Sequence, residues 1–153
     1  MPATHGRVRN GPYGGMGGEY YNAEHDEHKI RRVDAWGRSY RGYDVLNGFQ
    51  FTYDDGHKGP LVGHENPNDH KDFTFEDGEK IDRMTVYAGF DEGFVNGFDF
   101  HTNYNHDFTV AGKEGKVNHL PHLGNGEWIG AEGRDPIHGA AEVVDNIDIW
   151  FKA

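Results

Sequence analysis

The sequence contains no cysteine among its 153 residues. This absence excludes disulfide bonds, thiolate metal ligands and a cysteine nucleophile, although it does not decide between an oxidising and a reducing compartment. No apolar run is long enough to cross a bilayer, and the N-terminus has no apolar signal segment. Because the numbering begins at Met1, we expect either a cytoplasmic protein or a secreted one whose leader has been left out.

Basic residues are also scarce. The chain has 15 Lys and Arg against 26 Asp and Glu, which gives a formal net charge of −11 with neutral histidines. Such a surface repels phosphate backbones and anionic lipid, so we expect no nucleic-acid partner and no membrane insertion. Cations and neutral ligands are accommodated more easily. The 11 histidines gain charge near pH 6, so association is expected to depend on pH.

Sustained helical periodicity is missing as well. Only 35% of the residues are hydrophobic, but 14% are aromatic, and there are 23 Gly and six Pro. Aromatic residues suit half-buried strands, and frequent Gly and Pro indicate many turns, so the composition predicts an all-β protein. No linker or change of composition interrupts the chain, so we expect one domain over residues 1–153, with residues 1–7 as a flexible tail.

What the sequence does contain is a strand phrase that occurs three times. It reads Asn-Gly-Phe-Gln-Phe at 47–51, Asn-Gly-Phe-Asp-Phe at 96–100 and Asp-Asn-Ile-Asp-Ile at 145–149, so successive copies start 49 residues apart. Apolar and polar residues alternate, as in a strand with one buried face. A second phrase precedes the copies, at residues 29–33, 80–84 and 128–131. The constant period predicts three similar units of paired strands.

The copies differ at their first position, which is Asp145 in the third and Asn47 and Asn96 in the others. An Asn-Gly pair commonly forms a hairpin turn, but its recurrence before strand-like residues favours the interpretation that each pair opens a strand.

Residues 11–18 read Gly-Pro-Tyr-Gly-Gly-Met-Gly-Gly and contain five glycines. Glycine has no Cβ, so this segment predicts a loop whose backbone approaches another group closely. It is not a nucleotide-binding fingerprint, because no strand–helix–strand unit follows it.

The glycine-rich segment, the Phe-x-Phe-x-Thr-Asn segment at 98–103 and the close Gly-Arg…Asp-x-Ile-x-Ile-aromatic together resemble the jacalin-related lectins, over about residues 8–151. The resemblance implies a β-prism I fold, with three four-stranded antiparallel Greek-key sheets in pseudo-threefold symmetry. It also implies a non-enzymatic lectin that binds mannose-type or galactose-type glycans. The uninterrupted chain through the glycine segment is similar to the mannose-type group.

The resemblance also implies one shallow sugar site, between the glycine loop and the loop before the last strand. Gly17 and Gly18 match the glycines that approach a sugar hydroxyl, and Asp145 matches the aspartate that accepts from two adjacent hydroxyls. Val143 and Val144 match residues that offer backbone N–H groups. A carboxylate with two acceptor oxygens suits the fixed hydroxyl pair of a sugar.

The chain departs from the family pattern near this site. Ala141 stands where the family has the glycine of Gly-x-x-x-Asp, and residues 135–139 form an apparent insertion. We expect this insertion to narrow or reshape the pocket. Tyr13 or Tyr20 is expected to cover an apolar sugar face. Because the other two units have asparagine in place of the aspartate, we expect one site per chain.

Other side chains suggest different chemistry. Residues 25–28 (His-Asp-Glu-His) and 119–122 (His-x-x-His) invite a metal interpretation, but neither supplies a full ligand set. The acidic pairs at 54–55 and 76–79 resemble glycosidase carboxylates, yet they lie in turn signals, where acidic residues are common. We therefore expect no catalytic residue, no metal site and no cofactor.

The leading hypothesis is a lectin whose partners are glycans and glycoproteins. Shallow sugar sites bind weakly, since a millimolar dissociation constant corresponds to about −4 kcal/mol, so we expect a homo-oligomer, a dimer, that gains avidity from several sites. One alternative is an acidic structural or matrix protein of the same fold that binds Ca²⁺ or mineral and has a vestigial sugar site. Another is a sugar-targeting module of a larger toxin or enzyme.

Overall fold

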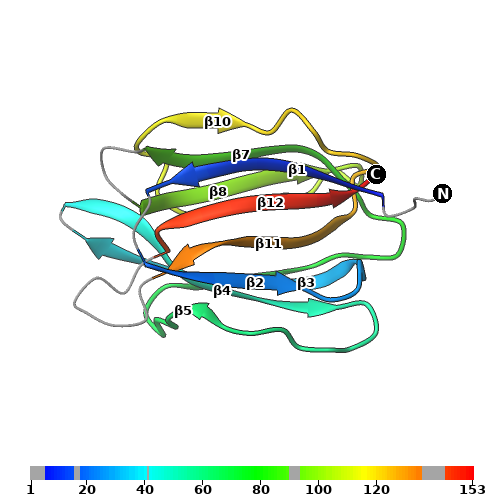
Figure 1. The fold of residues 1–153 in the computed structure, drawn as a ribbon, viewed down its shortest axis with the longest axis horizontal. Helices are drawn as coiled ribbons and strands as arrows, with labels where there is room; N and C mark the ends of the chain where they lie inside the picture. The colour runs from blue at the N-terminus through cyan, green and yellow to red at the C-terminus, as the bar shows by residue number, and fades with distance from the viewer. Residues whose placement is uncertain (1–5, 16–17, 41, 90–93, 136–143) are drawn as a thin grey trace.

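The computed structural model describes residues 6–15, 18–40, 42–89, 94–135 and 144–153 (Figure 1). These residues form β-strands joined by turns, with no helix among them. Accordingly, the described part of the chain holds no helix that is long and apolar enough to cross a membrane. The all-β prediction is confirmed.

The strands form three four-stranded antiparallel sheets. The first sheet has the order β1 (Arg7–Gly14), β12 (Asn146–Lys152), β11 (Trp128–Asp135), β2 (Glu19–Glu24). The second sheet has the order β5 (Val62–Gly63), β4 (Tyr43–Tyr53), β3 (Ile30–Tyr40), β6 (His70–Thr74). The third sheet has the order β10 (Val117–His119), β7 (Ile81–Gly89), β8 (Phe94–Thr102), β9 (Asp107–Ala111).

Each sheet is a Greek key. In this motif three successive strands lie side by side, and the fourth strand returns to lie beside the first. The third sheet shows this directly, because β10 returns to lie beside β7. The first sheet has the same order only if the chain is treated as a circle, since β1 and β12 come from opposite ends of the sequence. Figure 1 shows these two strands side by side, with the N- and C-termini at the same end of the molecule.

The 49-residue period corresponds to the pseudo-threefold arrangement of the sheets. The residues just before the strand phrases, Leu46, Val95 and Val144, are fully buried and lie together. The amide of Val144 donates to the Leu46 carbonyl at 3.1 Å, and the Val95 amide donates to the Val144 carbonyl at 2.8 Å. These bonds connect the three sheets to one another where the repeated strands begin.

The first residues of the three phrases also occupy equivalent positions. Each one accepts a bond at its carbonyl from the neighbouring edge segment: His64 N to Asn47 O at 3.0 Å, Gly112 N to Asn96 O at 2.9 Å and Gly15 N to Asp145 O at 2.8 Å. The prediction of three similar units is therefore confirmed at the level of individual hydrogen bonds.

We expected each Asn-Gly pair to open a strand, and this expectation was wrong. β4 begins at Tyr43 and β8 at Phe94, so both pairs lie inside a strand. The physical reason is close backbone contact. A Cβ on Gly48 would lie 2.5 Å from the His64 carbonyl oxygen, and one on Gly97 would lie 2.4 Å from that of Gly112. Glycine is needed there because another strand passes over it.

The first half of the glycine-rich segment is also not a loop. Strand β1 extends to Gly14 and pairs with β12, with a register shift between Asn10 and Tyr13. Arg7 pairs with Lys152 and so belongs to the strand rather than to a tail. Residues 1–5 and 16–17 lie outside the described residues.

The core lies between the three sheets and is rich in aromatic side chains. Trp128 of the first sheet contacts rings of both other sheets, with centroid separations of 4.9 Å to Phe51 and 5.8 Å to Phe98. Trp36 and Trp150 are also buried. A shared core holds the three sheets in fixed positions, and these sheets carry the loops at both ends of the molecule.

Candidate functional site

The segment that follows β1 has to cross one end of the first sheet. β1 and β2 are the two edge strands of this sheet, with β12 and β11 between them. β1 ends beside the start of β12, and β2 begins beside the end of β11, at the left end of the molecule in Figure 1. Gly15, the first residue of the glycine loop (residues 15–18), therefore meets Asp145, the residue that precedes β12.

Hydrogen bonds hold this crossing in place. The Gly15 amide donates to the Asp145 carbonyl at 2.8 Å, and the Asn146 side-chain amide donates to the Gly15 carbonyl at 3.0 Å. Gly14 has a φ of 114°, and a Cβ there would lie 2.2 Å from the Asp145 carbonyl oxygen. A side chain at position 14 would force the glycine loop away from the start of β12.

Arg134 of β11 links Gly18 and Asp145, the described residues on the two sides of the expected site, which we call the cleft. Its Nη1 donates to the Gly18 carbonyl at 3.1 Å, and its own carbonyl accepts from the Asp145 amide at 3.0 Å. Gly18 and Asp145 precede β2 and β12, the strands on either side of β11, so their strands lie about 9.5 Å apart, twice the usual strand spacing.

The expected site residues have different outcomes. Gly18 is exposed, with a φ of 82°, and Asp145 is partly buried. Val144 is fully buried, and its amide already donates to Leu46 inside the protein. We therefore remove Val144 from the expected set of backbone donors. Gly17 and Val143 lie outside the described residues, as do Ala141 and the insertion apart from Asp135.

An exposed tyrosine lies next to the cleft on the outer face of the first sheet. Tyr20 is 62% exposed, and its hydroxyl donates to Glu132 Oε2 at 2.6 Å. Tyr13 instead packs against the hydrophobic core, so Tyr20 is the better placed of the two to cover a sugar face. A hollow of about 200 Å³ lies here, with Tyr20, Glu132 and Arg134 among its walls.

Charged groups under this hollow form a linked network. Arg9 donates to Glu132 at 2.5 Å and to Asp148 at 2.7 Å. Burial raises the pKa of the Asp148 carboxyl above its ordinary value, and the Arg9 guanidinium offsets only part of that effect. The network fixes the position of the Tyr20 hydroxyl, because Glu132 accepts hydrogen bonds from both Arg9 and Tyr20.

A larger hollow lies elsewhere, on the outer face of the third sheet, with a volume of about 590 Å³. Its polar groups are bonded to one another. Tyr87 donates to Asp99 at 2.6 Å, and His101 bonds Asp82 at 2.7 Å. No glycine loop approaches this hollow in the described structure, so we place the candidate site at the cleft.

Among the residues that the structure describes, three groups of side chains are close enough to hold a metal ion, all of them away from the cleft. They are His25, His28 and Asp55; Asp34, His70 and Asp72; and Glu76, Glu79 and His106. In the second group, the Arg32 guanidinium already lies 3.0 Å from Asp34 and 3.6 Å from Asp72. In the third, buried Glu79 accepts bonds from its own surroundings. His119 belongs to none of the groups and bonds Thr85 instead.

Sequence reasoning missed Arg134 and Asn146. Asn146 carried a weak signal, because it replaces the glycines found at positions 48 and 97 of the repeat. Arg134 appeared only as part of the Gly-Arg motif, which does not reveal its contact with the Gly18 carbonyl.

Comparison with known proteins gives the same fold. The family model of the jacalin-like lectin domain matches residues 10–147. The mannose-binding lectin from champedak shares 23% identity at a TM-score of 0.73, covering 99% of both chains. Artocarpin, solved as its mannotriose complex, shares 22% identity at a TM-score of 0.72, covering 96% of this chain and 97% of that one. No curated protein sequence matches the chain.

The lamprey immune protein is also similar, at 18% identity and a TM-score of 0.78. The match covers 98% of this chain but only 45% of that one, so this chain spans less than half the length of that relative. The family match extends over nearly the whole sequence, and the three Greek-key sheets have the β-prism I architecture of these lectins. The chain therefore belongs to the jacalin-like lectin family.

Proposed function

We propose that this chain is a lectin that recognises mannose-type glycans through one shallow cleft between the glycine loop and the start of β12. The observation that carries the proposal is the pair of hydrogen bonds at the two described ends of the glycine loop, where Gly15 bonds Asp145 and Arg134 bonds Gly18. The champedak protein is a mannose-binding lectin, and artocarpin forms a complex with mannotriose. An identity of 22–23% to these lectins supports the shared fold only. Whether this chain prefers mannose therefore depends on the residues of its own site.

In this proposal the Asp145 carboxylate accepts hydrogen bonds from two adjacent sugar hydroxyls, because its two oxygens match their spacing. The Gly18 amide donates to a third polar group, with Gly17 and Val143 as further backbone contacts. Arg134 does not touch the sugar. It holds the Gly18 carbonyl and so orients the loop before the ligand arrives.

We further infer that the protein binds glycans without transforming them and that the described strands form one domain around a shared core. A shallow site with few polar contacts binds weakly, so a homodimer or larger oligomer would supply avidity. The net charge of −11 disfavours nucleic acid and anionic membranes as competing partners.

Asp145→Asn tests the proposed site. The substitution keeps the shape but removes the charge, and a hydrogen bond to a charged group contributes about 1.5–3 kcal/mol, so affinity for methyl-α-mannoside should fall about 10- to 100-fold. Calorimetric titration and a glycan array provide the measurement.

Asp99→Asn is the matched control, because Asp99 lies on the outer face of the third sheet and should leave binding unchanged. Undiminished binding by Asp145→Asn would refute the proposed site. Calcium binding by a wild-type chain that binds no glycan would favour the acidic structural protein instead.

A further inference from the structure

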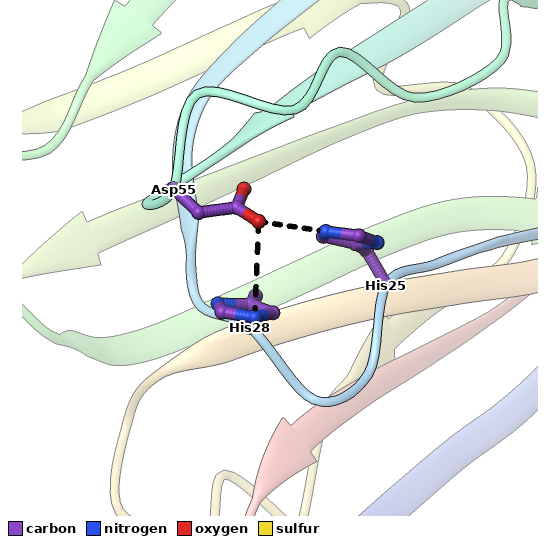
Figure 2. A group of neighbouring side chains, drawn as sticks. All are labelled: His25, His28 and Asp55. Carbon is purple, nitrogen blue, oxygen red and sulfur yellow. Dashed lines mark hydrogen bonds and ion pairs between the residues drawn. The ribbon is translucent and has the colours of Figure 1, made fainter.

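Two turns meet at the end of the molecule opposite the cleft. The first connects β2 to β3, and the His28 amide donates to the His25 carbonyl at 2.8 Å. The two residues between them, Asp26 and Glu27, have left-handed backbones with φ values of 47° and 60°. This tight turn places His25 and His28 at its two ends, with both rings on the same side (Figure 2).

The second turn follows β4 and contributes a carboxylate. The Gly56 amide donates to the Tyr53 carbonyl at 2.9 Å, which closes the turn around Asp54 and Asp55. The Asp54 amide donates to the Lys29 carbonyl at 2.8 Å, so backbone hydrogen bonding attaches the second turn to the first. The position of Asp55 relative to the two histidines is therefore set by the main chain.

The three side chains converge on a small volume. Figure 2 shows both imidazoles facing Asp55, whose Oδ2 lies 2.8 Å from His25 Nε2 and 3.8 Å from His28 Nε2. One ligand atom from each residue lies within 4.8 Å of the others. A tetrahedral zinc ion with bonds of about 2.0–2.1 Å holds its ligand atoms about 3.3 Å apart. The His25 and His28 rings are stacked with an interplanar angle of 21°, and zinc binds in the plane of an imidazole, so one ring has to rotate to bring the three atoms around one ion.

Neighbouring groups orient these ligands as a metal would require. Asp54 Oδ1 lies 2.7 Å from His28 Nδ1, which favours the tautomer with its proton on Nδ1 and leaves Nε2 with a lone pair. The His57 amide donates to Asp55 Oδ1 at 2.9 Å, so Oδ2 is left facing the imidazoles. The His25 ring stacks between His28 and His57, with centroids 4.9 Å and 4.0 Å away.

The exposure and charge of this group also allow a cation to bind. Its three side chains are partly exposed, so an ion can enter from solvent. The adjacent Lys29 does not compete, because its Nζ bonds the Glu79 carbonyl at 2.9 Å. The group of Asp34, His70 and Asp72 differs in this respect, since both of its carboxylates already form ion pairs with an arginine.

We propose that His25, His28 and Asp55 form a Zn²⁺ site, with the remaining coordination position open to water. Two imidazoles and one carboxylate are a common zinc donor set, in which carboxylates bonded to the outer ring nitrogens orient the ligands. The site goes beyond sugar recognition. His25 and Gly18 lie at opposite ends of β2, so zinc should leave mannoside affinity unchanged.

Calorimetric titration of the metal-free full chain with ZnCl₂ at pH 7.5 tests the site. Wild type should bind one zinc ion per chain in a first, high-affinity phase of the titration. His25→Ala and Asp55→Asn should each weaken it at least 10-fold, because each removes a direct ligand. His70→Ala is the matched control, since His70 Nε2 also lies 2.8 Å from an aspartate oxygen, and it should bind zinc like wild type.

The proposal fails if wild type shows no high-affinity zinc binding, if both ligand variants bind zinc as tightly as wild type, or if His70→Ala weakens zinc binding as much as they do. Circular dichroism of each variant checks that the fold is kept. Mannoside titration of the same samples separates the two proposals, because loss of zinc binding with intact mannoside binding concerns only this site.

Discussion

At the scale of single residues, Glu79 shows how a buried carboxylate is accommodated in a core with few charges. Its side chain is 0% exposed, and it accepts from the Glu76 amide at 2.9 Å and from Thr102 Oγ1 at 2.6 Å. His106 Nδ1 lies 2.7 Å from the same carboxylate. Burial alone would raise the pKa of Glu79, but these hydrogen bonds outweigh it, and the pKa lies below its ordinary value.

Glu79→Gln should therefore lower the free energy of unfolding by about 2–3 kcal/mol at pH 7. A lowered pKa means that ionised Glu79 contributes stability above the ordinary value of 4.5, and that this contribution disappears as pH falls through the lowered pKa. Urea unfolding at pH 7 and pH 3 measures the effect, which should be smaller at pH 3. Glu76→Gln is the control, because it keeps the Glu76 amide. An equal loss at both pH values would show that the charge of Glu79 is not responsible.

Arg134 acts at the same scale on the cleft. Arg134→Ala removes the donor to the Gly18 carbonyl but leaves the main chain that bonds Asp145. We expect mannoside affinity to fall about 3- to 10-fold, less than for Asp145→Asn, because only the orientation of the loop is lost. Calorimetry compares it with Arg83→Ala on β7, an exposed arginine far from the glycine loop. Unchanged affinity in Arg134→Ala would contradict the orienting role.

At the scale of elements, the repeated strands carry the fold, and their glycines mark where strands cross closely. Alternating residues at 96–100 were enough to predict a strand, but its start was wrong by two residues, because β8 begins at Phe94. The sequence does not reveal that the Gly112 carbonyl lies over Gly97. The dipeptide Asn-Gly looks the same in a hairpin turn and in such a crossing.

Gly97→Ala should consequently destabilise the protein by about 2–3 kcal/mol, as expected for overpacking against fixed backbone. Gly56→Ala is a useful comparison. Gly56 has a φ of 88° with open space around it, so this variant should lose only about 1 kcal/mol from backbone strain. Denaturant unfolding of the two variants gives the difference. Equal losses would mean that the close approach at Gly97 has no energetic consequence.

At the scale of the whole molecule, the constant 49-residue spacing was visible in the sequence because one central strand of each sheet carries a version of the same phrase. The structure adds what spacing cannot give, namely which loops meet at each end. Asp145 and the glycine loop were paired in advance through the family resemblance. The metal-binding group was not, since His25 and His28 looked incomplete until the structure brought Asp55 beside them.

The central claim is that one end of the first sheet holds the sugar, between Gly18 and Asp145. The most direct measurement is a crystal structure of the chain with methyl-α-mannoside. The account predicts one sugar per chain, with two adjacent hydroxyls donating to the Asp145 carboxylate and the Gly18 amide donating to the sugar. A sugar bound instead in the hollow of the third sheet, or a cleft that stays empty at saturating mannoside, would contradict it.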